Sequence, residues 1–187
     1  MEIIKNLLIN DENIKSMQVK EATDFNVKKL LNNNNLDQSQ SIRFGKLFEK
    51  LLKDLIKGKG YKIINEEFLD VYNTGSKTNK GKKDLDICFI KDDTIFYFES
   101  KLNLNLDSEK SKATDDKILE INDYLINENK NLKVVSSLIT CWWEKEEGMV
   151  ITTKTNILFM KDFLGLIGIS CTKSEYYKIM FDFGKLI

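Results

Sequence analysis

Histidine and proline are absent from this 187-residue sequence, and arginine and cysteine are scarce. Without histidine, the chain cannot form a Ser-His-Asp triad, use a histidine general base or build a histidine-ligated metal site. The three cysteines, Cys88, Cys141 and Cys171, show no CxxC spacing, which excludes a zinc finger. A chain with so few cysteines and no disulfide pattern is expected in a reducing cytoplasm.

Long hydrophobic runs and an excess of one charge are also missing. No apolar run approaches the ~20 residues needed to cross a bilayer, and the N-terminus lacks a signal-peptide pattern, so we expect no membrane partner. The 29 basic and 29 acidic residues cancel, unlike the composition of a protein that coats DNA. Because Arg43 is the only arginine, base-specific contacts would depend mainly on other polar side chains and backbone groups.

Acidic residues and a lysine flank two short apolar blocks between positions 84 and 101. Asp84 and Asp86 precede the first block, and Glu99 and Lys101 follow the second. A polar segment containing Asp92–Asp93 separates the blocks, which predicts a β-hairpin. If Asp92–Asp93 form a two-residue turn, Asp86 lies opposite Glu99, and Asp84 lies opposite Lys101.

This register predicts that the three carboxylates and the ammonium point to the same side of the hairpin, because side chains alternate along a strand. Facing carboxylates such as those of Asp86 and Glu99 repel each other unless a cation lies between them. A divalent ion meets that need, and oxygen ligands without histidine or cysteine favour Mg²⁺, with Mn²⁺ as a substitute. The predicted metal ligands are Asp86, Glu99 and Asp84.

Two other interpretations of these acids stay open. They can be charged ends of two exposed strands, although the apolar run Phe96–Phe98 before Glu99 favours a buried strand, in which an unpaired carboxylate is costly. Alternatively, a longer turn shifts the register by two residues, and Asp84 rather than Asp86 becomes the main metal ligand.

An Asp-x(n)-Glu-x-Lys pattern on a hairpin resembles the signature of the PD-(D/E)xK nuclease superfamily. The segments Lys82–Ile87 and Tyr97–Asn103 look most like those of a type II restriction endonuclease. The proline of the motif is missing, but it lies in the half of the motif that is degenerate in the family. The resemblance covers about residues 41–140, and it implies an α/β fold, an α+β mixed sheet flanked by helices, with a restriction-endonuclease-like core.

The resemblance also implies the chemistry and the partners. It implies a site-specific endonuclease that hydrolyses double-stranded DNA by in-line attack of water and leaves 5′-phosphate ends. Asp86 and Glu99 would hold one or two Mg²⁺ ions, which activate water and stabilise the leaving oxygen. Lys101 would orient the water and neutralise charge. The implied partners are DNA, a second copy of the chain in a homodimer and a cognate DNA methyltransferase.

A further catalytic candidate is Glu49, because the family often places an acidic residue on the helix before the hairpin. Residues 41–52 predict this helix, whose apolar stripe comprises Phe48, Leu51, Leu52 and Leu55. Glu49 falls at the edge of the stripe, where an ordinary boundary glutamate is an equally good interpretation.

Two lysine clusters flank the hairpin and are candidate DNA contacts. They are Lys77, Lys80, Lys82 and Lys83 before it, and Lys110 and Lys112 after it. Lysines contact phosphates readily, but a run of lysines is equally typical of a solvated loop.

The length fits one domain spanning residues 1–187. It is predicted to comprise an N-terminal helical extension at 1–35, a catalytic core at 41–140 and C-terminal elements at 141–187. The core is expected to contain strands at 61–64, 68–71 and 134–140 and a helix at 113–126 with Thr114 as its N-cap.

Two rival functions stay open besides restriction. Another nuclease of the same superfamily, such as a junction resolvase or a repair endonuclease, would use the same residues on branched or damaged DNA. A non-catalytic DNA-binding or protein-interaction domain would keep the acids for structural reasons.

Overall fold

A five-stranded mixed sheet forms the centre of the fold in this computed structural model, which describes residues 27–64 and 85–185. The strand order follows the sequence, and the strands are β1 (Lys62–Ile63), β2 (Ile87–Lys91), β3 (Thr94–Ser100), β4 (Lys133–Ile139) and β5 (Ile157–Leu158). The first three strands are antiparallel neighbours, whereas β3, β4 and β5 run parallel to one another. The expected mixed α/β fold, with a mixed sheet flanked by helices, is therefore confirmed.

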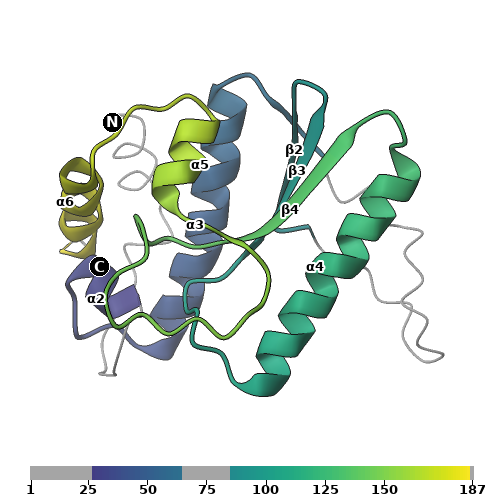
Figure 1. Cartoon of the computed structure of the whole chain (residues 1–187). Helices are drawn as coiled ribbons and strands as arrows, with labels where there is room; N and C mark the ends of the chain where they lie inside the picture. Colours follow the sequence, from purple (N-terminus) through teal and green to yellow (C-terminus); the bar gives the residue numbers. More distant parts are fainter. Residues whose placement is uncertain (1–26, 65–84, 186–187) are drawn as a thin grey trace.

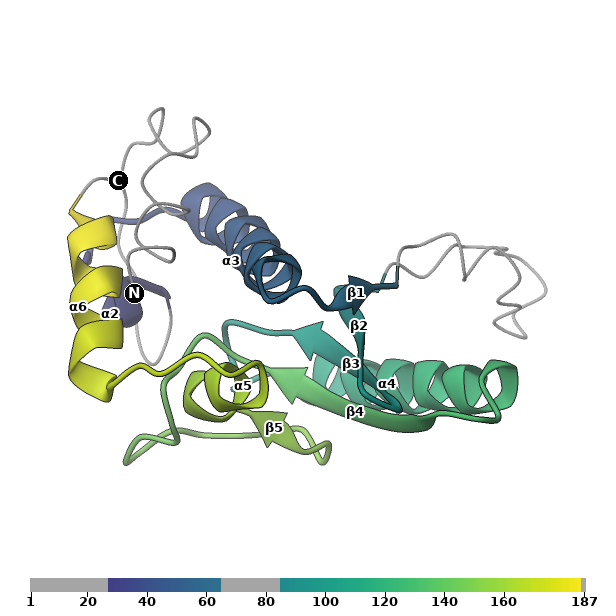
Figure 2. The ribbon, with the colours of Figure 1, turned by 90° about the horizontal axis from the view of Figure 1, so that it is seen from above.

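The helices lie on both faces of this sheet. They are α2 (Val27–Leu31), α3 (Gln38–Gly58), α4 (Ser108–Glu128), α5 (Met160–Leu166) and α6 (Lys173–Gly184). Helices α3 and α5 cover one face and α4 covers the other (Figure 1). Seen from above, α3 lies over the β1–β2 end and α5 lies toward β5 (Figure 2). In the described part of the chain, no helix is both long and apolar enough to cross a bilayer.

Successive side chains of β3 point to opposite faces of the sheet and therefore contact different helices. Phe98 points toward α5, where its ring meets Phe163 with 6.4 Å between centroids. Glu99, the next residue, points to the opposite face and contacts Lys117 of α4. The face of β3 that carries the acid is therefore the face covered by α4.

The β2–β3 hairpin has the register that its sequence predicts. Ile87 pairs with Phe98 and Lys91 pairs with Thr94, which leaves Asp92–Asp93 as a two-residue turn. Asp92 has a φ of 52°, a left-handed conformation that aspartate tolerates better than most residues. Because β2 begins at Ile87, Asp86 lies immediately before the strand, and Asp84 lies outside the described residues.

Helix α3 buries the apolar stripe predicted for it. Asp37 caps its N-terminus in a reciprocal capping box, because the Asp37 carboxylate accepts from the Gln40 N–H and the Gln40 side chain accepts from the Asp37 N–H. Phe48, Leu51 and the other stripe residues are almost fully buried. This packing fixes the helix against the sheet and determines which way Glu49 faces.

Helix α4 begins earlier than predicted. Asp107 is its N-cap and accepts from the Lys110 N–H at 2.8 Å, so the prediction that Thr114 caps the helix is wrong. Thr114 lies inside the helix and is buried toward the sheet, where Ile118 and Ile121 also lie. Aspartate is the better N-cap, and it is free to take this role because it precedes the stripe that faces the sheet.

The segments at the two ends of the described chain pack together. Helix α2 lies against α6 beside α3 and α5 (Figure 1), and the Asn33 side chain donates to the Gly184 carbonyl at 2.9 Å. Helix α2 belongs to the predicted N-terminal extension, of which residues 27–35 are described. The strand predicted at 68–71 lies outside the described residues.

Candidate active site

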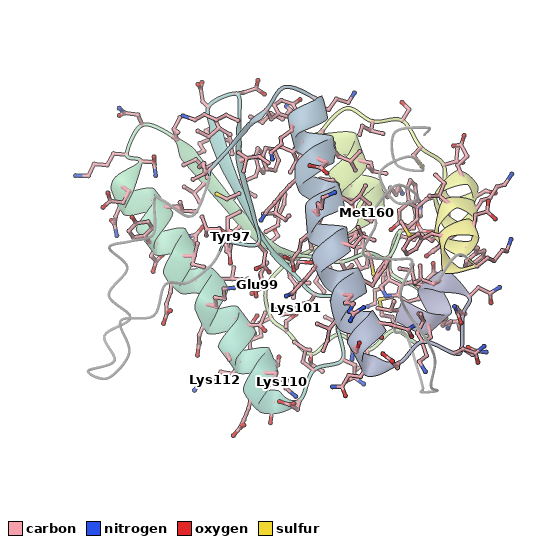
Figure 3. All side chains as sticks on the ribbon, turned by 180° about the vertical axis from the view of Figure 1, so that it is seen from behind. Tyr97, Glu99, Lys101, Lys110, Lys112 and Met160 are labelled. Atoms are coloured by element: carbon pink, nitrogen blue, oxygen red, sulfur yellow. The ribbon has the colours of Figure 1, made fainter. Side chains whose placement is uncertain are left out.

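The predicted catalytic residues gather where β3 ends. Tyr97 and Glu99 point to the same face of the strand, and Lys101 follows directly after it, so the three side chains lie in a row between α4 and α3 (Figure 3). The Lys101 ammonium lies 2.7 Å from Glu99 Oε1. This end of the sheet therefore carries both charged residues of the Glu-x-Lys sequence.

Asp86 reaches the same site from the start of β2. Its Oδ2 accepts from the Ser100 backbone N–H at 2.8 Å, which holds the carboxylate beside the last residues of β3. The Asp86 side chain is only 16% exposed. The structure thus brings Asp86 and Glu99 to one side of the hairpin, as the register predicts.

A second lysine, which the sequence analysis missed, joins the two acids. The Lys117 ammonium of α4 lies 2.6 Å from Glu99 Oε2 and 3.8 Å from Asp86 Oδ1. The available signal was its place next to Ile118 and one turn before Ile121, at the edge of the stripe that faces the sheet. A lysine at the edge of this stripe can contact a polar side chain on the face of the sheet that the helix covers.

The two neighbouring lysines favour the ionised form of Glu99. Burial raises the pKa of its carboxyl group, but Lys101 and Lys117 outweigh burial and hold the pKa below its usual value. The buried hydroxyl of Tyr97 donates to Glu99 Oε2 at 2.9 Å. Both carboxylate oxygens therefore have hydrogen-bond donors, and the side chain is fixed in one orientation.

The pKa values of the other two acids, Asp86 and Glu49, are shifted in the opposite direction. Burial, followed by the nearby charge of Glu99, raises the pKa of Asp86 despite the opposing effects of Lys117 and the Ser100 N–H. Burial, followed by the charge of Asp86, also raises the pKa of Glu49. Glu49 is half-buried on α3 and lies close enough to feel the charges at the end of β3. Three acids with divergent proton affinities in one place are typical of functional sites.

The predicted DNA-contacting lysines fall in different places. Lys110 and Lys112 are exposed on the first turns of α4 (Figure 3). At about 100° per residue, Lys110 lies on the flank of α4 that carries Lys117, whereas Lys112 lies on another flank. Lys112 lines an open pocket with Asp115 and Thr155. The other predicted cluster, which comprises Lys77, Lys80, Lys82 and Lys83, lies outside the described residues.

The donor set at the end of β3 fits a hard divalent ion. Within residues 27–64 and 85–185, no group of three or more histidine, cysteine, aspartate or glutamate side chains could hold a metal ion. Two carboxylates do share one cation, because the Lys117 ammonium contacts both Asp86 and Glu99. Mg²⁺ is commonly held by one or two carboxylates together with waters and substrate phosphates. Asp86 and Glu99 would be the protein ligands of such an ion, and Asp84, the third predicted ligand, lies outside the described residues.

Comparison with known proteins finds no relative of this chain. The chain matches no family model, no curated protein and no solved structure. The arrangement of acids and lysines at the end of β3 is therefore the feature of the molecule that bears on its function.

Proposed function

We propose that the protein is a Mg²⁺-dependent endonuclease of the PD-(D/E)xK superfamily, most like a type II restriction endonuclease. It hydrolyses phosphodiester bonds of double-stranded DNA at a short specific site and leaves 5′-phosphate ends. The observation that carries this proposal is the convergence of Asp86 and Glu99 on one cation, with Lys101 on the other oxygen of Glu99.

The arrangement of elements supports a restriction-endonuclease-like core. Helix α3 precedes an antiparallel set of three strands, and α4 then connects β3 to the parallel strand β4. The same order occurs in unrelated α/β domains, so the residues at the end of β3 carry the assignment. Glu49 on α3 supplies the additional acid that the resemblance leads us to expect.

In this proposal, Asp86 and Glu99 hold the ion. A bound Mg²⁺ supplies Lewis-acid activation of water and of the scissile phosphate. The chain positions both ligands in advance, because the Ser100 N–H holds Asp86 and the Tyr97 hydroxyl holds Glu99. Ligands with fixed orientations lower the reorganisation required when the charged transition state forms.

Lys101 supplies a positive charge at the edge of the site. Its side chain is 31% exposed, whereas the side chain of its partner Glu99 is 4% exposed. The ammonium lies 2.7 Å from Glu99 Oε1, beside the proposed metal ligands, where a lysine can orient water and neutralise a phosphate. Glu49 borders the same site and serves as an additional metal or water contact.

The proposed partners follow from this chemistry and from the resemblance. Two copies of the chain related by a two-fold axis would cut both strands of a palindromic site. A DNA methyltransferase of matching specificity would protect the host genome. Both proteins would work in the cytoplasm, where the DNA and Mg²⁺ are found.

Digestion of DNA tests the proposal. Unmethylated plasmid and phage DNA incubated with the protein and Mg²⁺ should give discrete fragments whose sequenced ends share one short motif. Cleavage confined to branched DNA would instead identify a junction resolvase. A folded protein that leaves both substrates intact across Mg²⁺ and Mn²⁺ concentrations would reject nuclease activity.

A non-catalytic DNA-binding or protein-interaction domain is the second candidate. It is favoured by the contact between Lys117 and Glu99, because a lysine that compensates a buried acid can be purely structural. In that case, the neutral variants Glu99→Gln and Lys101→Met would leave nucleic-acid or partner binding unchanged. The nuclease proposal predicts loss of Mg²⁺-dependent cleavage in both variants.

A further inference from the structure

Lys117 occupies the position between the two acids that a divalent ion is expected to take. Its ammonium lies 2.6 Å from Glu99 Oε2 and 3.8 Å from Asp86 Oδ1. Among the described residues, the ion pairs within 4.0 Å join Lys117 to both acids. Lys101 pairs with Glu99 alone, through Oε1. A cation-binding position between the acids is thus filled from within the chain.

We propose that Lys117 is an internal substitute for the metal: its ammonium bridges Asp86 and Glu99 in the metal-free protein, and a divalent ion must displace it to bind there. Lys117 therefore sets the divalent affinity of the site. The inference rests on the proposed function, because it requires these two acids to be metal ligands.

The charges of the site explain why a substitute is useful. Two carboxylates held side by side in a partly buried position repel each other, and burial makes the repulsion stronger than it would be in water. The ammonium reduces that repulsion until a metal arrives. An ion and an ammonium cannot both lie between the acids, because they are both positive and compete for the same oxygens.

The position of Lys117 also allows it to leave. Its side chain is 25% exposed, so part of it already meets solvent. The lysine stem is a flexible four-carbon chain on the rigid helix α4, and its rotation requires no movement of the backbone. Displacement of the Lys117 ammonium by a divalent ion therefore leaves the fold intact, and the displaced ammonium stays beside the site.

The test compares Lys117→Gln with wild type in thermal unfolding and in Mn²⁺ binding, measured from the electron paramagnetic resonance signal of free Mn²⁺. In EDTA, the variant should unfold about 5 °C lower, because the acids lose their shared cation. Its affinity for Mn²⁺ should be at least about tenfold higher, because the competing charge is gone. Saturating Mn²⁺ should restore its unfolding temperature to that of Mn²⁺-loaded wild type.

Lys112→Gln is the matched control, because it removes the same charge from another flank of α4. It should leave both readouts at their wild-type values, and an equal effect of Lys112→Gln would overturn the inference. Lys117→Arg keeps the charge and should bind Mn²⁺ no more tightly than wild type. If Lys117→Gln does not fold in EDTA, it should fold in Mn²⁺, and a chain that stays unfolded in both would contradict the proposal.

Asp86→Asn separates failure of this inference from failure of the proposed function. If Mn²⁺ binding depends on Asp86 but is no tighter in Lys117→Gln, the metal site stands and the role of Lys117 is rejected. If neither wild type nor Lys117→Gln binds Mn²⁺ in a manner that depends on Asp86, the metal site and the inference both fall.

Discussion

Tyr97 shows how a single uncharged residue can organise the site. Its buried hydroxyl donates to Glu99 Oε2, and removing a donor from a buried carboxylate costs about 1–3 kcal/mol. We predict that Tyr97→Phe lowers the free energy of unfolding by this amount and also slows Mg²⁺-dependent cleavage, since Glu99 loses part of its orientation. Chemical denaturation and single-turnover cleavage assays measure the two effects.

The control for this prediction is Tyr61→Phe, which removes a hydroxyl from a tyrosine whose described contacts are made through its ring. Its stability should change by less than about 0.5 kcal/mol, as for most substitutions away from buried polar networks. Equal losses in the two variants would show that the hydrogen bond to Glu99 contributes nothing specific.

The sequence predicts part of this site at the level of individual residues. The two-residue turn at Asp92–Asp93 fixes the register, and the register alone places Asp86 beside Glu99. Lys117 could not be found in the same way, because its contact with β3 depends on how α4 is rotated over the sheet. Local patterns report which residues share a strand face, whereas the rotation of a helix depends on packing across the whole domain.

Lys110 and Lys112 lie on different flanks of α4, and we predict that they differ in their contribution to DNA binding. Lys110 lies on the flank that carries Lys117, so it is the lysine placed to contact DNA bound at the site. In a Glu99→Gln background, which prevents cleavage, Lys110→Gln should weaken DNA binding and reduce the slope of log affinity against log salt by about 1. Lys112→Gln should change neither quantity, and equal losses would show that DNA does not follow this flank.

At the scale of elements, the contact between α2 and α6 depends on one glycine. A Cβ at Gly184 would overlap the backbone oxygen of Leu31, whereas a Cβ at Gly165 in α5 would meet nothing within 4 Å. We predict that Gly184→Ala lowers stability by about 1–3 kcal/mol through overpacking. Gly165→Ala should be neutral or stabilising by up to about 1 kcal/mol.

Thermal unfolding of the two glycine variants measures this difference directly. For a chain of this size, the loss in Gly184→Ala corresponds to a decrease of roughly 3–10 °C in unfolding temperature. An unchanged temperature for Gly184→Ala would mean that α2 does not pack closely against α6 in solution.

Helix positions were easier to predict than helix ends. The apolar stripes of α3 and α4 identified both helices, because a spacing of three and four residues follows directly from helix geometry. The predicted start of α4 is wrong, because Thr114 and Asp107 are both acceptable caps by residue type and the structure uses Asp107. Thr114 faces the sheet and is buried there, a fact that depends on the tertiary structure.

At the scale of the whole molecule, the fold brings distant parts of the chain to one end of β3. Asp86 comes from the start of β2, Glu99 and Lys101 from the end of β3, and Lys117 from α4, while Glu49 lies nearby on α3. The mixed sheet makes this possible, because β2 begins where its antiparallel neighbour β3 ends. The resulting site combines three carboxylates with two lysines, the set from which the nuclease proposal is built.

The proposed nuclease needs these acids for metal-dependent hydrolysis of DNA. Its sharpest test is the single-turnover rate at which Glu99→Gln cleaves plasmid DNA in Mg²⁺, compared with wild type. Glutamine keeps the shape of the side chain and removes its charge, so the rate should fall at least about a thousandfold, equivalent to about 4 kcal/mol of transition-state stabilisation. EDTA should abolish wild-type cleavage. A Glu99→Gln variant that is folded and cleaves as fast as wild type would contradict the account.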